Sequence, residues 1–190
     1  SMLTLALITL LGCNKPADLE VSEDFVTVEV DEGFNPPSCG YEVGDVACDL
    51  ELTNSQGETV SLYDFKDNAI VLDFSTAWCY YCQAAAFESQ QIQDMHESKG
   101  FTYIIVLIED FNREEPSAEF LREWEDHFNI TSVQILSGNR SLIDLAAVNG
   151  WFIEAYPTFY YIDRDMVITD YQRGFSSAGV NAMIESLLSE

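Results

Sequence analysis

Hydrophobic and polar positions fall into blocks along the chain, and the blocks predict strands and helices in alternation. Residues 70–74 and 101–108 are nearly continuous apolar runs, which is typical of strands buried on both faces. Residues 116–128 instead carry apolar side chains at helical spacing, which predicts an amphipathic helix. The other expected elements are a hairpin within 41–66, a helix at 79–98, a strand at 133–136, a short helix at 141–148, strands at 158–163 and 166–172, and a helix at 176–188. Strands that alternate with helices indicate an α/β fold.

Trp78-Cys79-Tyr80-Tyr81-Cys82 is the stretch that carries the most informative chemistry. It closely follows the expected strand 70–74, and residues 82–88 are rich in strong helix formers, so both cysteines lie where a helix begins. Unpaired backbone N–H groups and the positive end of the helix dipole stabilise a thiolate at that place. Thiolates attack disulfides, and residues three apart on a helix are neighbours. We therefore expect a redox pair, with Cys79 at the exposed tip and Cys82 about one turn further in.

Two residues far from each other in sequence support a redox site. Asp73 lies within the apolar strand, where a carboxylate is costly unless it has a task. We expect it to take the proton of Cys82 when that thiol attacks a mixed disulfide. Pro157 stands immediately before the apolar run 158–163, and proline is tolerated at the first position of a strand although it fits badly inside a sheet.

Together these features resemble the thioredoxin superfamily, in which a cis-proline before a strand packs beside the CxxC pair. Pro157 matches that proline, and Asp73 matches the family's buried aspartate. Residues 43–66 are similar to the entry hairpin of TlpA/ResA-type thiol–disulfide oxidoreductases, which are tethered to membranes of the bacterial envelope, and Thr76-Ala77-Trp78-Cys79 fits the same branch. The resemblance covers residues 41–190.

This resemblance implies a thioredoxin-like α/β fold: a central mixed sheet flanked by helices, with an N-terminal β-hairpin extension. It implies a protein-disulfide oxidoreductase in which Cys79 is the nucleophile and Cys82 resolves the mixed disulfide. Asp73 would transfer protons, and Pro157 would keep the strand edge beside Cys79 open to an extended client segment. The expected contacts with the client are Trp78, Tyr80, Tyr81 and Tyr156. No cofactor is needed. The expected partners are client proteins with disulfides or thiols, and a membrane thiol electron donor or acceptor.

Two other classes of function stay open on the sequence. Thr76-Ala77-Trp78-Cys79 is similar to the T-x-x-C motif of thiol peroxidases, but Leu72 stands where that motif has proline and no arginine lies nearby in sequence. The second alternative is a redox-inert or metal-carrying thioredoxin-fold binding module. Zinc would need further ligands at a fitting spacing, and we expect His96 and His127 on helix surfaces, so no metal site is predicted.

The remaining three cysteines have separate interpretations. Cys39 and Cys48 bracket a short loop, and an extracytoplasmic location would let them form a structural disulfide; otherwise they are two unpaired thiols that lie close together. Cys13 ends a mostly apolar segment that is too short to span a bilayer. Leu10-Leu11-Gly12-Cys13 resembles a bacterial lipobox, which implies lipidation of Cys13. The alternative is an apolar segment that packs onto the fold or onto a neighbour.

The expected organisation is a signal and lipobox segment at 1–13, an acidic tether at 14–40 with a possible edge strand at 25–30, and the thioredoxin-like domain at 41–190. This places the protein outside the cytoplasm, in the bacterial periplasm or cell envelope. It would contact the membrane only through a lipid anchor.

Charge narrows the set of partners. Eight Lys and Arg residues against 33 Asp and Glu residues give a formal net charge of −25. This argues against binding to nucleic acid, because nothing offsets repulsion by the phosphates, and against an anionic membrane held by a basic patch. One interpretation of the negative charge is that it keeps the protein soluble in a salty environment. The alternative is that it attracts basic client proteins.

Overall fold

The computed structural model describes residues 34–189 of the chain. The predictions for the lipobox segment with Cys13, for the strand at 25–30 and for most of the acidic tether therefore lie outside the described residues. Within the described part, no helix is both long and apolar enough to cross a membrane.

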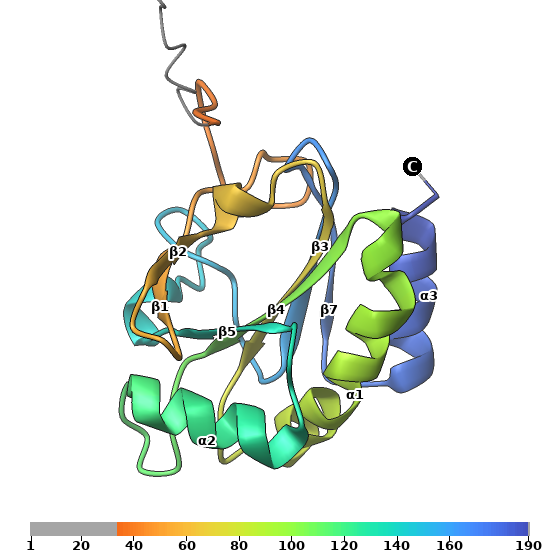
Figure 1. The fold of residues 1–190 in the computed structure, drawn as a ribbon. Helices are drawn as coiled ribbons and strands as arrows, with labels where there is room; N and C mark the ends of the chain where they lie inside the picture. The colour runs from red at the N-terminus through yellow and green to blue at the C-terminus, as the bar shows by residue number, and fades with distance from the viewer. Residues whose placement is uncertain (1–33, 190) are drawn as a thin grey trace, which may run out of the picture. The chain divides into compact units, whose positions relative to one another are not determined.

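A mixed sheet of seven strands forms the centre of the described part (Figure 1). Its order is β2-β1-β5-β4-β3-β6-β7. β3 pairs with β4 in parallel and with β6 in antiparallel orientation, and β4 and β5 are parallel. The strands are β1 (Glu51–Asn54), β2 (Thr59–Ser61), β3 (Ala69–Ser75), β4 (Phe101–Leu107), β5 (Gln134–Ser137), β6 (Thr158–Ile162) and β7 (Ile168–Arg173). The predicted mixed α/β sheet and its N-terminal hairpin, formed by β1 and β2, are confirmed.

Three helices contribute to the hydrophobic cluster on one face of this sheet: α1 (Tyr80–His96), α2 (Ala118–Phe128) and α3 (Ser177–Leu187). Figure 1 shows α1 and α3 side by side. Because side chains of a strand alternate between faces, Tyr103 and Ile105 of β4 join this cluster while Ile104 and Val106 point to the other face. The sheet is thus buried on both sides, as the continuous apolar runs predicted.

The second face is covered without a long helix. The short 3-10 helix η1 (Leu62–Phe65) and the segment before β6 pack there. Trp151 is fully buried, with its ring centroid 5.2 Å from that of Phe74 and 4.7 Å from that of Tyr160. These aromatic contacts hold the segment against the sheet close to where β6 begins.

The prediction of a helix at 141–148 is wrong. Only the 3-10 turn η3 (Arg140–Leu142) forms, and the chain then runs as an irregular loop. The Asp144 carboxylate accepts hydrogen bonds from the backbone N–H groups of Ala146, Val148 and Asn149. Such local side-chain bonds offer the backbone an alternative to the helix, and Ala147 has a φ of 53°, in the left-handed region.

The expectation that His96 lies on a helix surface is also wrong, whereas His127 is exposed. His96 is only 1% exposed and packs its ring against Phe101, at the C-terminal end of α1. Burial lowers the pKa of its imidazole, and the nearby Lys99 acts in the same direction. This histidine is part of the packing between α1 and β4, far along the helix from the cysteines.

Candidate functional site

The start of α1 positions the two cysteines. Cys79 is the N-cap residue, and its Sγ accepts a hydrogen bond from the Cys82 N–H over 3.4 Å. The Cys79 thiol donates to the backbone carbonyl of Tyr156, also over 3.4 Å. Both thiols are free, with 9% of Cys79 and 1% of Cys82 exposed. The expectation of an exposed tip at Cys79 is therefore wrong, because the Tyr156 segment lies against the sulfur.

Asp73 lies on β3 and is completely buried. Its carboxylate accepts hydrogen bonds from the Ser75 hydroxyl at 2.6 Å and the Tyr103 hydroxyl at 3.2 Å. Burial raises the pKa of Asp73 to about 7, since the loss of solvent outweighs the opposing effect of both hydrogen bonds. Burial, reinforced by the charge of Asp73, also raises the pKa of the Cys82 thiol. Asp73 and Cys82 are thus both buried, and the charge of Asp73 acts on the Cys82 thiol.

Pro157 precedes β6, and the Tyr156–Pro157 peptide bond is cis. β6 pairs with β3 so that Thr158 lies opposite Phe74 and Phe159 opposite Asp73. This register brings the start of β6 to the end of β3 from which the chain leads to Cys79. The pairing of two strands distant in sequence therefore brings Asp73, Cys79 and Pro157 into one site.

Trp78 is held by a network that the sequence reasoning missed. Its indole N–H donates to the Glu109 carboxylate at 2.8 Å, and the Arg140 guanidinium donates to the other oxygen of the same carboxylate. The Arg113 guanidinium lies 4.4 Å from the centre of the Trp78 ring, which is a cation–π geometry. Tyr156 packs edge-on at 6.0 Å. The sequence does contain one signal for this network: Glu109 stands directly after the apolar run 101–108, where a strand ends.

Glu109 is 1% exposed. Burial opposes its ionisation, but hydrogen bonds from Arg140 and Trp78 outweigh burial and hold its pKa below the usual range. Its backbone carbonyl also accepts from the Ala77 N–H at 2.8 Å. The Glu109 carboxylate thus fixes the Trp78 side chain, and the Glu109 backbone carbonyl fixes the backbone before Cys79.

Exposed aromatic side chains lie beside the cysteines in the chain, and two arginines lie near Trp78. Tyr80 and Tyr81 are 76% and 59% exposed, and Trp78 is 37% exposed. Next to Trp78 lies a cleft of about 350 Å³, lined by Trp78, Arg113, Arg140, Ile143, Leu145, Ile153 and Tyr156. The four aromatic side chains expected to contact a client thus occur beside the CxxC pair, together with two arginines.

Cys39 and Cys48 form a disulfide. It closes the turn before β1, and the Gly40 N–H donates to the Val46 carbonyl inside that turn at 2.8 Å. The turn is also bonded to β7, through the Gly44 N–H and the Ile168 carbonyl at 2.8 Å. The prediction of a structural disulfide is thus confirmed, and the alternative of two unpaired thiols is wrong.

The described residues contain no group of three or more His, Cys, Asp or Glu side chains that could hold a metal ion. The two histidines of this part lie on different helices, His96 on α1 and His127 on α2.

The fold and the paired cysteines define a thioredoxin-like protein. The model of the AhpC/TSA family matches residues 43–171, and the chain belongs to that family. It is 27% identical over 142 residues to the thioredoxin-like protein YneN of Bacillus subtilis, a match that covers 74% of this chain and 77% of that protein.

Solved structures show the same fold. A putative thiol:disulfide interchange protein DsbE from Chlorobium tepidum is 21% identical with a TM-score of 0.62, over 78% of this chain and 99% of that one. A secreted thiol-disulfide isomerase from Corynebacterium glutamicum is 17% identical with a TM-score of 0.63, over 83% of this chain and 98% of that one.

Proposed function

We propose that this protein is a thiol–disulfide oxidoreductase that exchanges disulfides with client proteins through Cys79 and Cys82. The observation that carries the proposal is the placement of both free thiols at the start of α1, with the buried Asp73 near Cys82. The names of the similar proteins, an interchange protein and a disulfide isomerase, point to the same chemistry.

In the reductive direction, the Cys79 thiolate attacks one sulfur of a client disulfide and releases the other as a thiolate. Cys82 then attacks the Cys79 sulfur of the mixed disulfide, which frees the client's second thiol and leaves a Cys79–Cys82 disulfide. Asp73, with a pKa of about 7, accepts the Cys82 proton in this second step at neutral pH. Oxidation of a client dithiol follows the reverse sequence.

The helix start favours Cys79 as the attacking thiol. Its sulfur already accepts the Cys82 N–H, and this bond strengthens when the sulfur becomes a thiolate. Cys82 is less exposed, and its pKa is raised by burial and by the charge of Asp73. Cys82 is therefore suited to the resolution of the mixed disulfide, in which Asp73 can accept its proton.

Pro157 and the aromatic side chains around Cys79 complete the client site in this proposal. An extended client segment would lie beside the Tyr156–Pro157 segment, just before β6 begins, in contact with Trp78, Tyr80 and Tyr81. The location we propose is extracytoplasmic, in the periplasm or cell envelope, with a lipid anchor at Cys13. The Cys39–Cys48 disulfide supports an oxidising compartment. A membrane thiol carrier would exchange electrons with the pair.

Activity assays test the proposal directly. Reduced protein should cleave a disulfide-linked fluorescent peptide pair, and both Cys79→Ser and Cys82→Ser should lose multiple turnover. Hydrogen peroxide offered in place of the disulfide should be consumed far more slowly. Faster reduction of peroxide would favour the thiol peroxidase, and a protein that turns over neither substrate would favour the binding module.

A further inference from the structure

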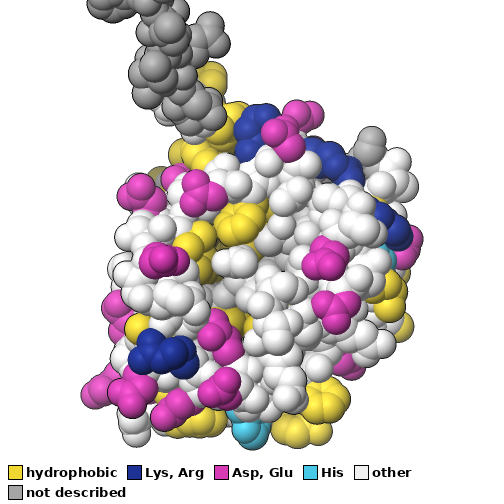
Figure 2. Space-filling model, viewed as in Figure 1, with side chains coloured by type: hydrophobic (Ala, Val, Ile, Leu, Met, Phe, Trp, Pro, Cys, Tyr) yellow, Lys and Arg dark blue, Asp and Glu magenta, His cyan; other side chains and the backbone are white. Residues whose placement is uncertain are grey.

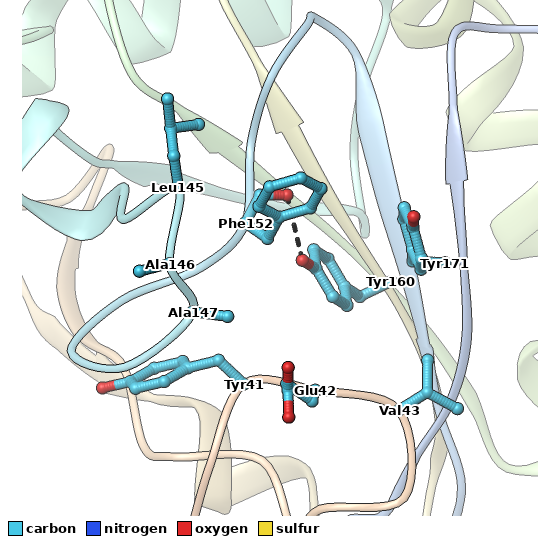
Figure 3. A pocket seen from close by; sticks show the side chains of 9 residues that line it. All are labelled: Tyr41, Glu42, Val43, Leu145, Ala146, Ala147, Phe152, Tyr160 and Tyr171. Atoms are coloured by element: carbon cyan, nitrogen blue, oxygen red, sulfur yellow. Dashed lines mark hydrogen bonds between the residues drawn. The ribbon is translucent and has the colours of Figure 1, made fainter.

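A second cleft, of about 460 Å³, lies between β6, β7 and the turn that follows Cys39 (Figure 3). Four aromatic residues line it: Tyr41, Phe152, Tyr160 and Tyr171. Tyr160 and Tyr171 are stacked with their ring centres 5.8 Å apart, and Phe152 meets Tyr171 edge-on at 6.4 Å. The Tyr160 hydroxyl donates to the Phe152 carbonyl at 3.0 Å, so the rings are held in place.

Among the described residues that line the cleft, Glu42 carries the one carboxylate. None of these lining residues is Lys or Arg. In Figure 3 the Glu42 side chain lies between Tyr41 and Val43, across the cleft from Phe152 and Tyr160. The turn that carries Glu42 is fixed by the Cys39–Cys48 disulfide and by the hydrogen bond from the Ile168 N–H to the Asp45 carbonyl at 2.9 Å.

The charge of the protein suits a cation at this place. The face shown in Figure 2 carries more acidic than basic side chains, in keeping with a net charge of −25. A Lys or Arg side chain is attracted by the faces of aromatic rings and by a carboxylate, and its aliphatic part covers apolar surface. Aromatic rings and a carboxylate carried on a fixed turn are complementary to such a side chain.

The cleft is a neighbour of the one beside Trp78, since Leu145 lines both. Leu145 is 65% exposed. The Tyr156 carbonyl contacts the Cys79 sulfur, and Tyr160 lies further along the same segment in β6. Tyr160, which lines this cleft, follows Tyr156, which lines the other, by four positions. Because an extended chain advances roughly 3.3 Å per residue, a client segment of about four residues would span the same stretch.

We propose that this cleft binds a Lys or Arg side chain of an extended client segment, about four residues from the client's reacting cysteine. The inference rests on the proposed function for its client. If the cleft binds this side chain, the protein selects clients that carry a Lys or Arg residue near their reacting cysteine.

Binding of peptides that lack cysteine tests the site apart from the chemistry. An extended eight-residue peptide with serine in place of cysteine and lysine four residues away is titrated into the ¹⁵N-labelled full chain. The matched peptide carries norleucine instead of lysine. We expect the lysine peptide to bind about fivefold more tightly and to shift the amide resonances of Tyr41, Glu42 and Tyr171.

Glu42→Gln should remove most of this preference and leave the affinity for the norleucine peptide unchanged. Glu51→Gln, at an exposed carboxylate on β1 near the other end of the sheet, should leave both affinities unchanged. Equal binding of the two peptides would mean that the cleft takes apolar side chains, and would overturn the proposal. So would shifts confined to residues around Trp78.

The corresponding peptides with a mixed disulfide at the cysteine then link the site to turnover. Lysine should lower KM about fivefold with little change in kcat, and Glu42→Gln should abolish the difference. Turnover that is equal for the lysine and norleucine peptides would overturn this inference while the proposed function stands. Absence of turnover for both, with the lysine preference in binding retained, would overturn the proposed function and still support the cation site.

Discussion

The Cys79 thiol donates a hydrogen bond to the backbone carbonyl of Tyr156 over 3.4 Å, although the two residues are 77 positions apart in the chain. The same sulfur accepts the N–H of Cys82. Cys79 is thus bonded from both sides, by the start of its own helix and by the segment that leads into β6. In the proposed exchange a client sulfur reaches Cys79 beside the Tyr156 carbonyl, so the position of this backbone segment controls access to the thiol.

The two thiols should differ in reactivity. In a short iodoacetamide pulse on the reduced protein at neutral pH, Cys79 should be alkylated first, because Cys82 is more deeply buried and its pKa is raised by burial and by the charge of Asp73. Peptide mapping by mass spectrometry gives the order. Preferential labelling of Cys82 would reverse the roles assigned here.

Trapping separates the same roles by chemistry. Cys82→Ser should accumulate mixed disulfides between Cys79 and clients, because the resolving thiol is missing, whereas Cys79→Ser should accumulate none. Non-reducing gels of extracts from cells that express each variant provide the measurement. Equal trapping by the two variants would show that either cysteine attacks first.

Asp73→Asn should slow resolution of the mixed disulfide by about a hundredfold at pH 7, because general-base assistance to Cys82 is lost. The loss should shrink at alkaline pH, where hydroxide replaces the base. Stopped-flow measurement of the resolution step from pH 6 to 9 gives the profile. An unaltered profile would make Asp73 a structural residue.

The same substitution should change the pH dependence of stability. The pKa of Asp73 rises from 3.8 to about 7 on folding, so the folded state binds the extra proton between these values. Stability therefore falls as pH rises from about 4 to 7, by up to about 4 kcal/mol, and the loss is complete above that window. Asp73→Asn should lack this fall and should equal or exceed the wild type at pH 8. Urea unfolding at pH 5 and pH 8 measures it, and a parallel fall in the variant would contradict the assignment.

Glu109→Gln should loosen Trp78. The variant keeps an acceptor for the indole N–H but loses the charge that holds Arg140, so we expect a raised KM, a shifted Trp78 indole resonance and a cost of about 1–3 kcal/mol in stability. The charge of Glu109 stabilises the fold above its ordinary pKa of 4.5, and this is lost as the pH falls through the lowered folded value.

Glu154→Gln, which breaks the more exposed pair with Arg173, is the matched control and should leave KM and the Trp78 resonance unchanged. An unchanged indole resonance in Glu109→Gln would show that the ring is placed by Arg113 and Tyr156 alone.

Removal of the Cys39–Cys48 disulfide by a double alanine substitution should lower the free energy of unfolding by about 2–3 kcal/mol, because the closed loop is short. Thermal unfolding followed by circular dichroism measures the change. The hydrogen bonds of the turn to β7 should preserve the fold. A larger loss that abolishes folding would give the turn a greater structural role than its contacts indicate.

Much of the sheet, and the place of the cysteine pair at the start of α1, could be predicted from local pattern. The apolar runs of β3 and β4, the helical spacing of α2 and the helix start at Cys79 depend on interactions between near neighbours in sequence. Asp73 stood out because a carboxylate in a buried strand is costly. The pattern predicts a helix after Arg140 where there is none, because the local bonds to the Asp144 carboxylate that replace it leave no signal in hydrophobic periodicity.

The sequence by itself determined the strands, the three long helices and the place of the cysteine pair at a helix start, since each follows from periodicity or from spacing over a few residues. Only the tertiary structure decided which distant groups meet that pair. Glu109 and Arg113 reach Trp78, and Arg140 reaches Glu109, because β3, β4 and β5 are parallel and the loops that follow them lie at the same end of the sheet. The burial that raises the pKa of Asp73 likewise arises only when α1 and the neighbouring strands exclude water around it.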